Sequence, residues 1–220
     1  MVERQLLIKT KILKKMKKLI LSIVALSSLS LASYAQTEKG KYILGGTASY
    51  ETSKTDAVNA KSSENLNIVP NVGYFVSDDF AIGTGIGYSF SKTAVASPTG
   101  INNAVIVSPF GRYYAGLSDQ FKFFGQASVP MAFGNVKAVD ANGDAGAKAG
   151  TSTSIGVALS PGFAYFPTKK LGIEFALKGI SYNSYKVKDA NDNDVVGAGR
   201  EDFSFGTNFF APQIGVQFHF

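Results

Sequence analysis

Hydrophobic and polar residues alternate with a period of two along most of the chain after residue 36. In residues 80–91, bulky apolar side chains such as Phe80, Ile82 and Ile86 share one face, and mostly Gly, Ala and Ser share the other. Alternation of this kind is typical of β-strands that bury one face, and it does not fit the 3.6-residue period of a helix. The pattern predicts eight strands, at residues 41–53, 64–76, 80–92, 104–116, 121–134, 152–166, 171–186 and 202–220.

The connections between the predicted strands alternate in length. The links after the second, fourth and sixth strands are short (77–79, 117–120 and 167–170), whereas the remaining links are long and polar. With an even number of strands, this alternation brings both ends of the strand array and all short turns to one side. Transmembrane β-barrels have short turns on one side and longer loops on the other. The predicted fold class is all-β, an eight-stranded antiparallel up-and-down transmembrane β-barrel.

The composition of the two faces indicates which of them is outside. A soluble ligand-binding barrel would turn its bulky apolar face inward and a charged face toward water. Here the non-bulky face consists mainly of Gly, Ala and Ser, which suits the narrow interior of an eight-stranded barrel. The bulky face suits lipid, so the membrane barrel is preferred over a soluble periplasmic lipid-binding barrel.

An internal repeat links the even-numbered strands. Residues 68–75, 107–114 and 159–166 share the frame apolar-x-Pro-x-x-x-Tyr-aromatic. The repeat predicts an aromatic girdle at the short-turn end of the barrel, formed by Tyr74, Phe80, Tyr113, Phe121 and Tyr165. Proline lacks a ladder donor and is expected at bulges, so the recurrent prolines predict a row of bulges at Pro70, Pro109, Pro130, Pro161 and Pro212. A change of phase in the last strand predicts one more bulge near Phe209–Phe210.

The amino-terminal segment has the pattern of a cleaved secretory signal. Four lysines between residues 14 and 18 precede the apolar run 19–32 and the small residues before Ala35. The predicted cleavage between Ala35 and Gln36 divides the chain into a signal peptide, 1–35, and a barrel domain, 36–220. A membrane-anchoring helix is disfavoured, because the run is shorter than the roughly 20 residues that span a bilayer.

Removing the signal changes the charge balance of the chain. Residues 1–35 hold seven of the 22 Lys and Arg residues and one of the 16 Asp and Glu residues. The remainder has 22 − 7 = 15 basic and 16 − 1 = 15 acidic residues, so a nucleic-acid partner is not expected. The chain has no cysteine, which excludes disulfides and thiolate metal sites.

The signal, the eight strands, the Pro-x-x-Arg-Tyr-Tyr segment at 109–114 and the aromatic end of the last strand resemble the small outer-membrane β-barrel family (OmpA/OmpX-like), in its Bacteroidetes-type, porin-family form. The resemblance implies a monomer in the outer membrane of a Gram-negative bacterium, with its short turns in the periplasm. It also implies that outer-membrane lipid, periplasmic chaperones and the barrel assembly machinery are partners. The machinery would read a C-terminal signal that consists of Gln213, Gly215, Phe218 and Phe220.

Several charged residues fall on the interior face of the predicted barrel. A buried charge needs a partner, so we expect a barrel-interior ionic network of Glu51, Arg112, Lys122, Glu174 and Lys178, with Arg112 and Glu174 in direct contact. Eight strands enclose only enough room for side chains, which favours a structural plug over an ion pathway.

No enzyme and no cofactor are expected. The only histidine, His219, lies at the short-turn end, and the chain offers no second histidine or cysteine for a nucleophile–base pair. Residues 140–144 and 189–194 resemble the start of a calcium loop, but Thr151 and Arg200 occupy the position of its bidentate glutamate, so no metal site is predicted. The expected function is a structural role in the envelope with loops for surface contact or adhesion; the alternatives are a small solute channel and the soluble lipid binder.

Overall fold

The computed structural model describes residues 36–54, 56, 62–92, 100–139, 145–206 and 213–220. Over these residues no helix is long and apolar enough to cross a membrane. The predicted signal peptide, residues 1–35, lies outside the described residues. The described part of the chain forms these strand segments: β1 (Tyr42–Ser53), β2 (Ser63–Ser77), β3 (Phe80–Lys92), β4 (Gly100–Gly116), β5 (Phe121–Ser128), β6 (Met131–Val139), β7 (Ala145–Tyr165), β8 (Leu171–Ala176), β9 (Ile180–Asp189), β10 (Arg200–Phe205) and β11 (Gln213–His219).

These segments make up eight strands of an antiparallel barrel, as the alternation predicted. β5 and β6 are the two halves of the fifth strand, β8 and β9 of the seventh, and β10 and β11 of the eighth. Each neighbouring pair is antiparallel, from β1–β2 around to β7, which pairs with both β8 and β9. The ring closes where Ile43–Gly46 of β1 pair with residues 216–219 of β11, which in turn pairs with β8. Among the described residues, closure between the first and last strands therefore rests on four residue pairs.

The two faces of the sheet are arranged as the sequence predicted. Bulky apolar side chains point out of the barrel, among them Ile86, Val157 and Ile214, which are 59%, 54% and 65% exposed. The buried residues Ile43, Ala81 and Ala164 point inward. This outward apolar face is one that water does not solvate well but lipid does.

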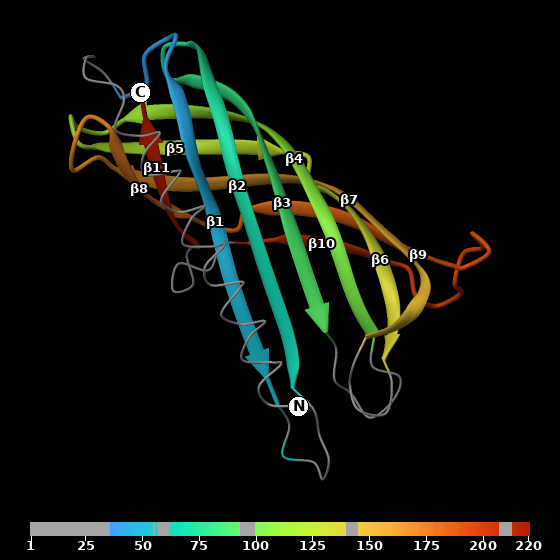
Figure 1. Cartoon of the computed structure of the whole chain (residues 1–220). Coiled ribbons are helices and arrows are strands. Elements are labelled where there is room, and N and C mark those ends of the chain that lie inside the picture. Colours follow the sequence, from blue (N-terminus) through green and yellow to red (C-terminus); the bar gives the residue numbers. More distant parts are fainter. Residues whose placement is uncertain (1–35, 55, 57–61, 93–99, 140–144, 207–212) are drawn as a thin grey trace. The chain divides into compact units, whose positions relative to one another are not determined.

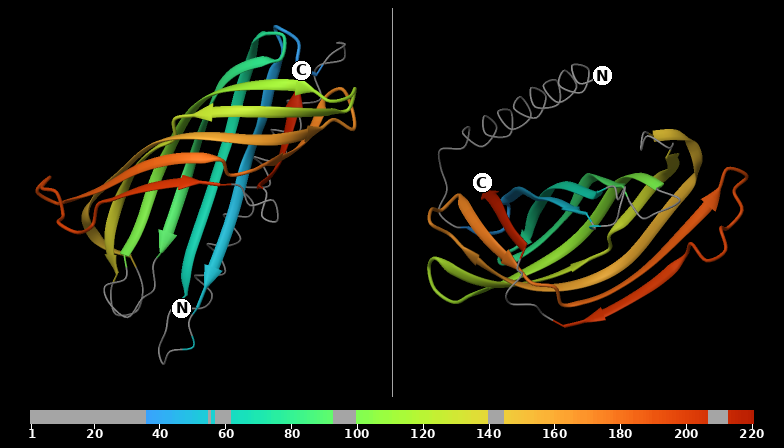
Figure 2. Two further views of the ribbon diagram at one scale, coloured as in Figure 1. Left: turned by 180° about the vertical axis from the view of Figure 1, so that it is seen from behind. Right: turned by 90° about the horizontal axis from the view of Figure 1, so that it is seen from below.

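The short and long connections lie at opposite ends of the barrel. The β2–β3, β4–β5 and β7–β8 turns gather near the start of β1 and the end of β11 (Figure 1), an end that we call the short-turn end. At the other end, the long link predicted between residues 134 and 152 is shorter, because β6 runs to Val139 and β7 begins at Ala145. β9 likewise runs to Asp189, and the β9–β10 hairpin projects from the side of the sheet (Figure 2).

The predicted row of proline bulges is wrong where the structure describes it. Pro70 and Pro109 pair in unbroken register with Gly46 and Thr84. Pro161 keeps its register with Gly125 of β5, but the ladder on its other side shifts by one residue, with the extra residue in the facing strand. Pro130 separates β5 from β6, yet both halves keep one register with β4 and with β7. The strands tolerate these prolines because proline keeps its carbonyl acceptor: the Pro109, Pro130 and Pro161 oxygens accept hydrogen bonds from Val129, Gly156 and Leu177 at 2.8–3.0 Å. Pro212 lies outside the described residues.

A bulge does occur in the seventh strand, at residues 177–179. β7 pairs Gly162 with Ala176 and Leu159 with Ile180, so three residues of the seventh strand lie opposite two of β7. The eighth strand changes phase as predicted, since Phe203 and Phe205 point outward on β10 and Ile214 and Val216 on β11. The predicted bulge at Phe209–Phe210 itself lies outside the described residues.

Candidate functional site

A buried ion pair lies inside the barrel, between opposite walls. Arg112 on β4 and Glu174 on β8 are 5% and 4% exposed, and their Nη1 and Oε1 atoms lie 2.5 Å apart. Both side chains reach the interior because they occupy the inward positions of their strands. The structure thus brings together the two residues that the sequence placed at the centre of the predicted network.

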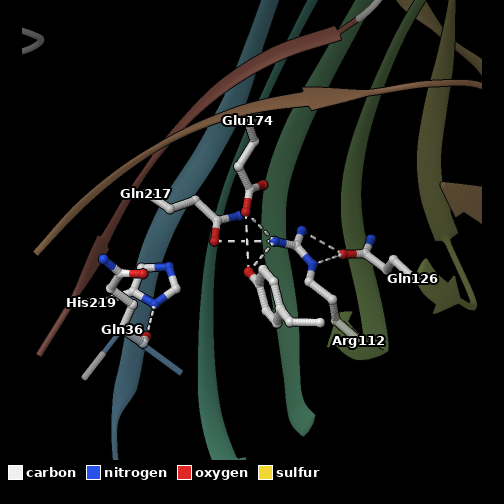
Figure 3. Close-up of polar contacts among 7 residues, drawn as sticks. Gln36, Arg112, Gln126, Glu174, Gln217 and His219 are labelled. Atoms are coloured by element: carbon white, nitrogen blue, oxygen red, sulfur yellow. Dashed lines mark hydrogen bonds and ion pairs between the residues drawn. The ribbon is translucent and has the colours of Figure 1, made fainter. Parts of the chain in front are cut away.

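Neutral side chains complete this cluster, which we call the interior network (Figure 3). Gln126 on β5 accepts two hydrogen bonds from the Arg112 Nε and Nη2 atoms, at 2.8 and 2.6 Å. Arg112 Nη1 also donates to the Tyr114 hydroxyl at 2.9 Å and to Gln217 Oε1 of β11 at 3.2 Å. The Tyr114 hydroxyl lies 3.1 Å from Glu174 Oε1 and donates to it. The planar fork of one guanidinium thereby joins four strands of the wall.

A layer of aromatic rings fills the lumen on the short-turn side of the interior network. We call this the aromatic layer; it comprises Phe75, Tyr114, Phe124, Phe166 and His219, all at most 2% exposed. The His219 ring lies 5.1 Å from Phe166 and 5.8 Å from Phe75, measured between centroids. Phe124 joins the layer to the ion pair, because the Arg112 Cζ atom lies 4.5 Å from its ring centroid. These rings pack against one another as a buried cluster in the lumen.

His219 is held in one tautomer. Its Nδ1 atom lies 2.5 Å from the carbonyl oxygen of Gln36 (Figure 3). A carbonyl can only accept, so Nδ1 carries the proton. Among the described residues, the buried Nε2 atom of His219 has no hydrogen-bond partner.

Lys122 belongs to a separate ion pair at the short-turn end. Its Nζ atom lies 3.0 Å from Asp79 Oδ1, in the turn between β2 and β3, and donates to the Thr37 hydroxyl at 2.7 Å. Burial raises the pKa of the Asp79 carboxyl, but hydrogen bonds from Thr37 and Lys122 and the charge of Lys122 outweigh it, so the pKa is lowered from its ordinary value.

The other two charges assigned to the interior network lie outside it. Lys178 is exposed, because the bulge at residues 177–179 reverses the phase of the seventh strand and buries Leu177 in its place. Glu51 shares the face of Ile43 but is exposed at the far end of β1. The expected set of five is thus corrected to the pair Arg112–Glu174, with Lys122 in a second, separate pair.

A polar cavity lies on the loop side of the interior network. Its volume is about 180 Å³, and its walls include Asn71, Ser108, Arg112, Ser160 and Glu174. The Asn71 Oδ1 atom is buried and, within the described residues, unpartnered. The lumen is therefore polar on the loop side and packed with rings on the other.

The residues assigned to the girdle lie on the outer surface at the short-turn end. Tyr74, Phe80, Tyr113 and Phe121 are 37%, 37%, 58% and 48% exposed. Phe121 stacks against Tyr165 at 4.7 Å between ring centroids. Of the four residues assigned to the C-terminal signal, Gln213 and Gly215 share the inward-facing phase of β11, and Phe218 has the outward phase.

The aromatic layer was missed by the sequence prediction, although its signal was present. Each repeated frame ends in two adjacent aromatic residues, at 74–75, 113–114 and 165–166. Adjacent residues of a strand point to opposite faces, so one member of each pair must point inward. Phe75, Tyr114 and Phe166 are those members.

The described calcium-like segment is satisfied by its own backbone. Asp189 Oδ1 accepts hydrogen bonds from the backbone nitrogens of Asn191 and Asn193 at 2.8 and 2.9 Å, which is an ordinary turn geometry. Across the described ranges, no group of three or more His, Cys, Asp or Glu residues could hold a metal ion. Residues 140–144 lie outside the described residues.

A family model for the outer membrane protein beta-barrel domain matches residues 21–220. Among solved structures, the N-terminal β-barrel domain of Pseudomonas aeruginosa OprF is 15% identical, with 84% of this chain and 100% of that chain covered and a TM-score of 0.42. Neisserial surface protein A is 14% identical, with 82% of this chain and 97% of that chain covered and a TM-score of 0.45. The E. coli outer membrane protein W is 12% identical, with 83% of this chain and 99% of that chain covered and a TM-score of 0.46. No curated protein matches the chain.

Proposed function

The chain belongs to the outer membrane protein β-barrel domain family, and we propose that it is a non-conducting, non-enzymatic barrel that supports the envelope and presents its loops at the cell surface. Family membership places it in the outer membrane of a Gram-negative bacterium. The alternative of a soluble periplasmic lipid binder is therefore wrong, and the outward apolar face gives the physical reason. The short-turn end is accordingly taken as the periplasmic end.

The observation that carries the proposal is the filled lumen. On its periplasmic side, the aromatic layer and the Arg112–Glu174 pair occupy the space between the walls. A solute that entered the polar cavity from the loop side would meet this packing, so the cavity is a blind vestibule. A small solute channel would instead need a continuous wet path.

Single-channel recording on the purified protein in a planar bilayer tests this role. We expect no discrete conductance steps above the baseline of protein-free membranes. Reproducible steps from a heat-modifiable, folded sample would replace the proposal with the small solute channel. In cells, a deletion strain should become more permeable to detergent and should recover when the chain is restored.

The lack of enzymatic activity is supported by the position of His219. It is the only histidine of the chain and is buried among rings, 2% exposed. A general base must reach the proton that it abstracts, and this ring does not reach solvent. Assay of the purified barrel on phospholipid and peptide substrates should give no turnover above the boiled control.

The loop end is the proposed contact surface. The β9–β10 connection is polar and exposed, with Val196 99% exposed at its tip. Replacing residues 190–199 with a short glycine-serine turn should abolish surface contact while the barrel still forms. Retained adhesion in that variant would argue against this part of the proposal.

Export and assembly complete the proposal. Cleavage after Ala35 would release the barrel domain 36–220, and the intact mass of the outer-membrane form tests it. Gln213, Gly215, Phe218 and Phe220 are proposed as the signal for the barrel assembly machinery after delivery by periplasmic chaperones. Phe220→Ala should then lower the amount of assembled barrel, and the mature protein should sediment as a monomer in detergent.

A further inference from the structure

Residues 36–40, directly before β1, are hydrogen-bonded to three separate parts of the periplasmic end. The Gln36 carbonyl accepts from His219 Nδ1 on β11 at 2.5 Å. The Lys39 nitrogen donates to Asp78 Oδ1 at 2.9 Å, and the Gly40 nitrogen donates to the Phe75 carbonyl at 2.9 Å. Segments that precede the first strand of a domain are poorly ordered unless they are tied down. These hydrogen bonds tie residues 36–40 to the barrel.

Thr37 is the centre of these contacts and is 4% exposed. Its hydroxyl donates to Asp79 Oδ1 at 2.5 Å and accepts from Lys122 Nζ at 2.7 Å. The Asp79 backbone nitrogen donates to the Thr37 carbonyl at 2.8 Å. Thr37, Asp79 and Lys122 thus form a closed triad, which ties the segment to the β2–β3 turn and to β5.

We propose that residues 36–40 form a strap that locks the seam between the first and last strands. The strap continues covalently into β1, and through Gln36 it holds the His219 side chain of β11. It therefore contacts both sides of a seam for which four residue pairs are described. The Thr37 triad anchors the strap elsewhere on the barrel, so β11 cannot leave β1 without breaking the Gln36–His219 contact or freeing the strap.

The strap lies next to the residues through which β1 pairs with β11. β1 pairs with β11 only over Ile43–Gly46, close behind the strap. Hydrogen bonds at one end of a short ladder oppose fraying at that end, because the first step of separation must then break them as well. The strap acts independently of the proposed surface role and of conductance.

Two single variants of the triad and one matched control test the strap. Asp79→Asn and Lys122→Met each remove one charge, and Asp119→Asn makes the same chemical change in the exposed β4–β5 turn. The mature protein, folded in detergent, is treated with trypsin, and cleavage after Lys39 is followed by intact mass. The temperature at which the compact band unfolds in SDS gels reports the seam.

In both triad variants we expect cleavage after Lys39 to become faster, on the order of tenfold, because a charge-assisted contact holds the strap closed. We also expect unfolding in SDS at a lower temperature than for Asp119→Asn, which should match the wild type. The double variant should be no worse than either single variant, since both break one triad.

The proposal is overturned if cleavage after Lys39 is unchanged in both triad variants. It is also overturned if the strap opens while the unfolding temperature stays at the wild-type value, because the strap would then be held without locking the seam. Thr37→Val provides a second route that leaves every strand intact: it removes only the hydroxyl, and the same two results are expected from it.

Discussion

At the scale of single residues, Arg112 contacts side chains from four strands of the barrel. Its guanidinium is hydrogen-bonded to Gln126, Tyr114, Glu174 and Gln217 and packs on the Phe124 ring. A buried ion pair adds little net stability, because both charges lose their hydration when they are buried. Removing one partner is costly, because the other charge stays buried without a counter-charge. Arg112 and Glu174 should therefore behave as a unit.

Arg112→Leu should destabilise the barrel by about 3–5 kcal/mol, because Glu174 would remain buried without its counter-charge. Arg112→Leu with Glu174→Leu should be less destabilising than Arg112→Leu alone. Urea unfolding in lipid vesicles, followed by tyrosine fluorescence, gives the two free energies. Arg200→Leu is the control: its pair with Asp202 is 68% and 58% exposed, so the change should stay within about 0.5 kcal/mol. A double variant worse than Arg112→Leu would contradict the paired role.

At the scale of strands, close backbone contacts depend on glycine at selected positions. A Cβ atom on Gly83 of β3 would lie 2.3 Å from the Val72 carbonyl oxygen and 2.7 Å from the Gly73 Cα atom. Both are backbone atoms, which cannot turn aside as a flexible side chain can. The β2–β3 ladder therefore has to shift if this glycine is replaced.

Gly83→Ala should lower the free energy of unfolding by about 1–3 kcal/mol, the usual cost of overpacking. Gly125→Ala in β5 is the matched control, because a Cβ atom there meets nothing within 4 Å. That variant should be neutral or slightly stabilising, since alanine restricts the unfolded chain. The temperature of band conversion in SDS gels compares the two proteins, and equal losses would show that the ladder adjusts freely.

The turn between β2 and β3 should make stability depend on pH. The pKa of Asp79 is lowered in the folded state, so the ionised carboxylate contributes stability above its ordinary pKa of 3.8. This contribution should disappear as the pH falls from that value through the lower folded pKa. Unfolding of the wild type and Asp79→Asn should differ by a constant amount between pH 6 and 8 and converge in acid. If the two proteins still differ in stability below the folded pKa of Asp79, the loss in Asp79→Asn comes from altered packing or hydrogen bonding and not from the lost charge.

The strands also show which parts of the fold and of the interior ion pair could be predicted from the sequence. Period-two alternation located all eight strands and placed Arg112 and Glu174 inward on opposite walls, because a closed antiparallel barrel leaves one choice of face. Lys178 was assigned to the wrong face, because the extra residue at 177–179 changes the phase and is set by pairing with β7. The bulges predicted at Pro70, Pro109 and Pro130 were wrong for the opposite reason: the missing donor is a local cost, and the neighbouring ladders hold the register.

At the scale of the whole molecule, the barrel is asymmetric along its axis. The loop-side lumen holds a polar cavity of about 180 Å³, and the periplasmic side holds the aromatic layer beneath the strap. Gln36, just before the first strand, and His219, at the end of the last strand, meet on that side of the barrel. Under the proposed non-conducting role, this contact would form as the barrel closes.

It follows that the lumen should open when the aromatic layer is thinned, without loss of the barrel. Phe75→Ser with Phe166→Ser removes two rings and lets water reach the His219 side chain, so planar-bilayer recordings should show ion conductance that the wild type lacks. Phe163→Ser, on the lipid-facing side and 42% exposed, is the matched control and should remain silent. Both proteins must first show the heat-dependent shift of a folded barrel. A folded double variant that still does not conduct would place the block at the Arg112–Glu174 pair, and adding Arg112→Ser to that variant would then be the change that opens the path.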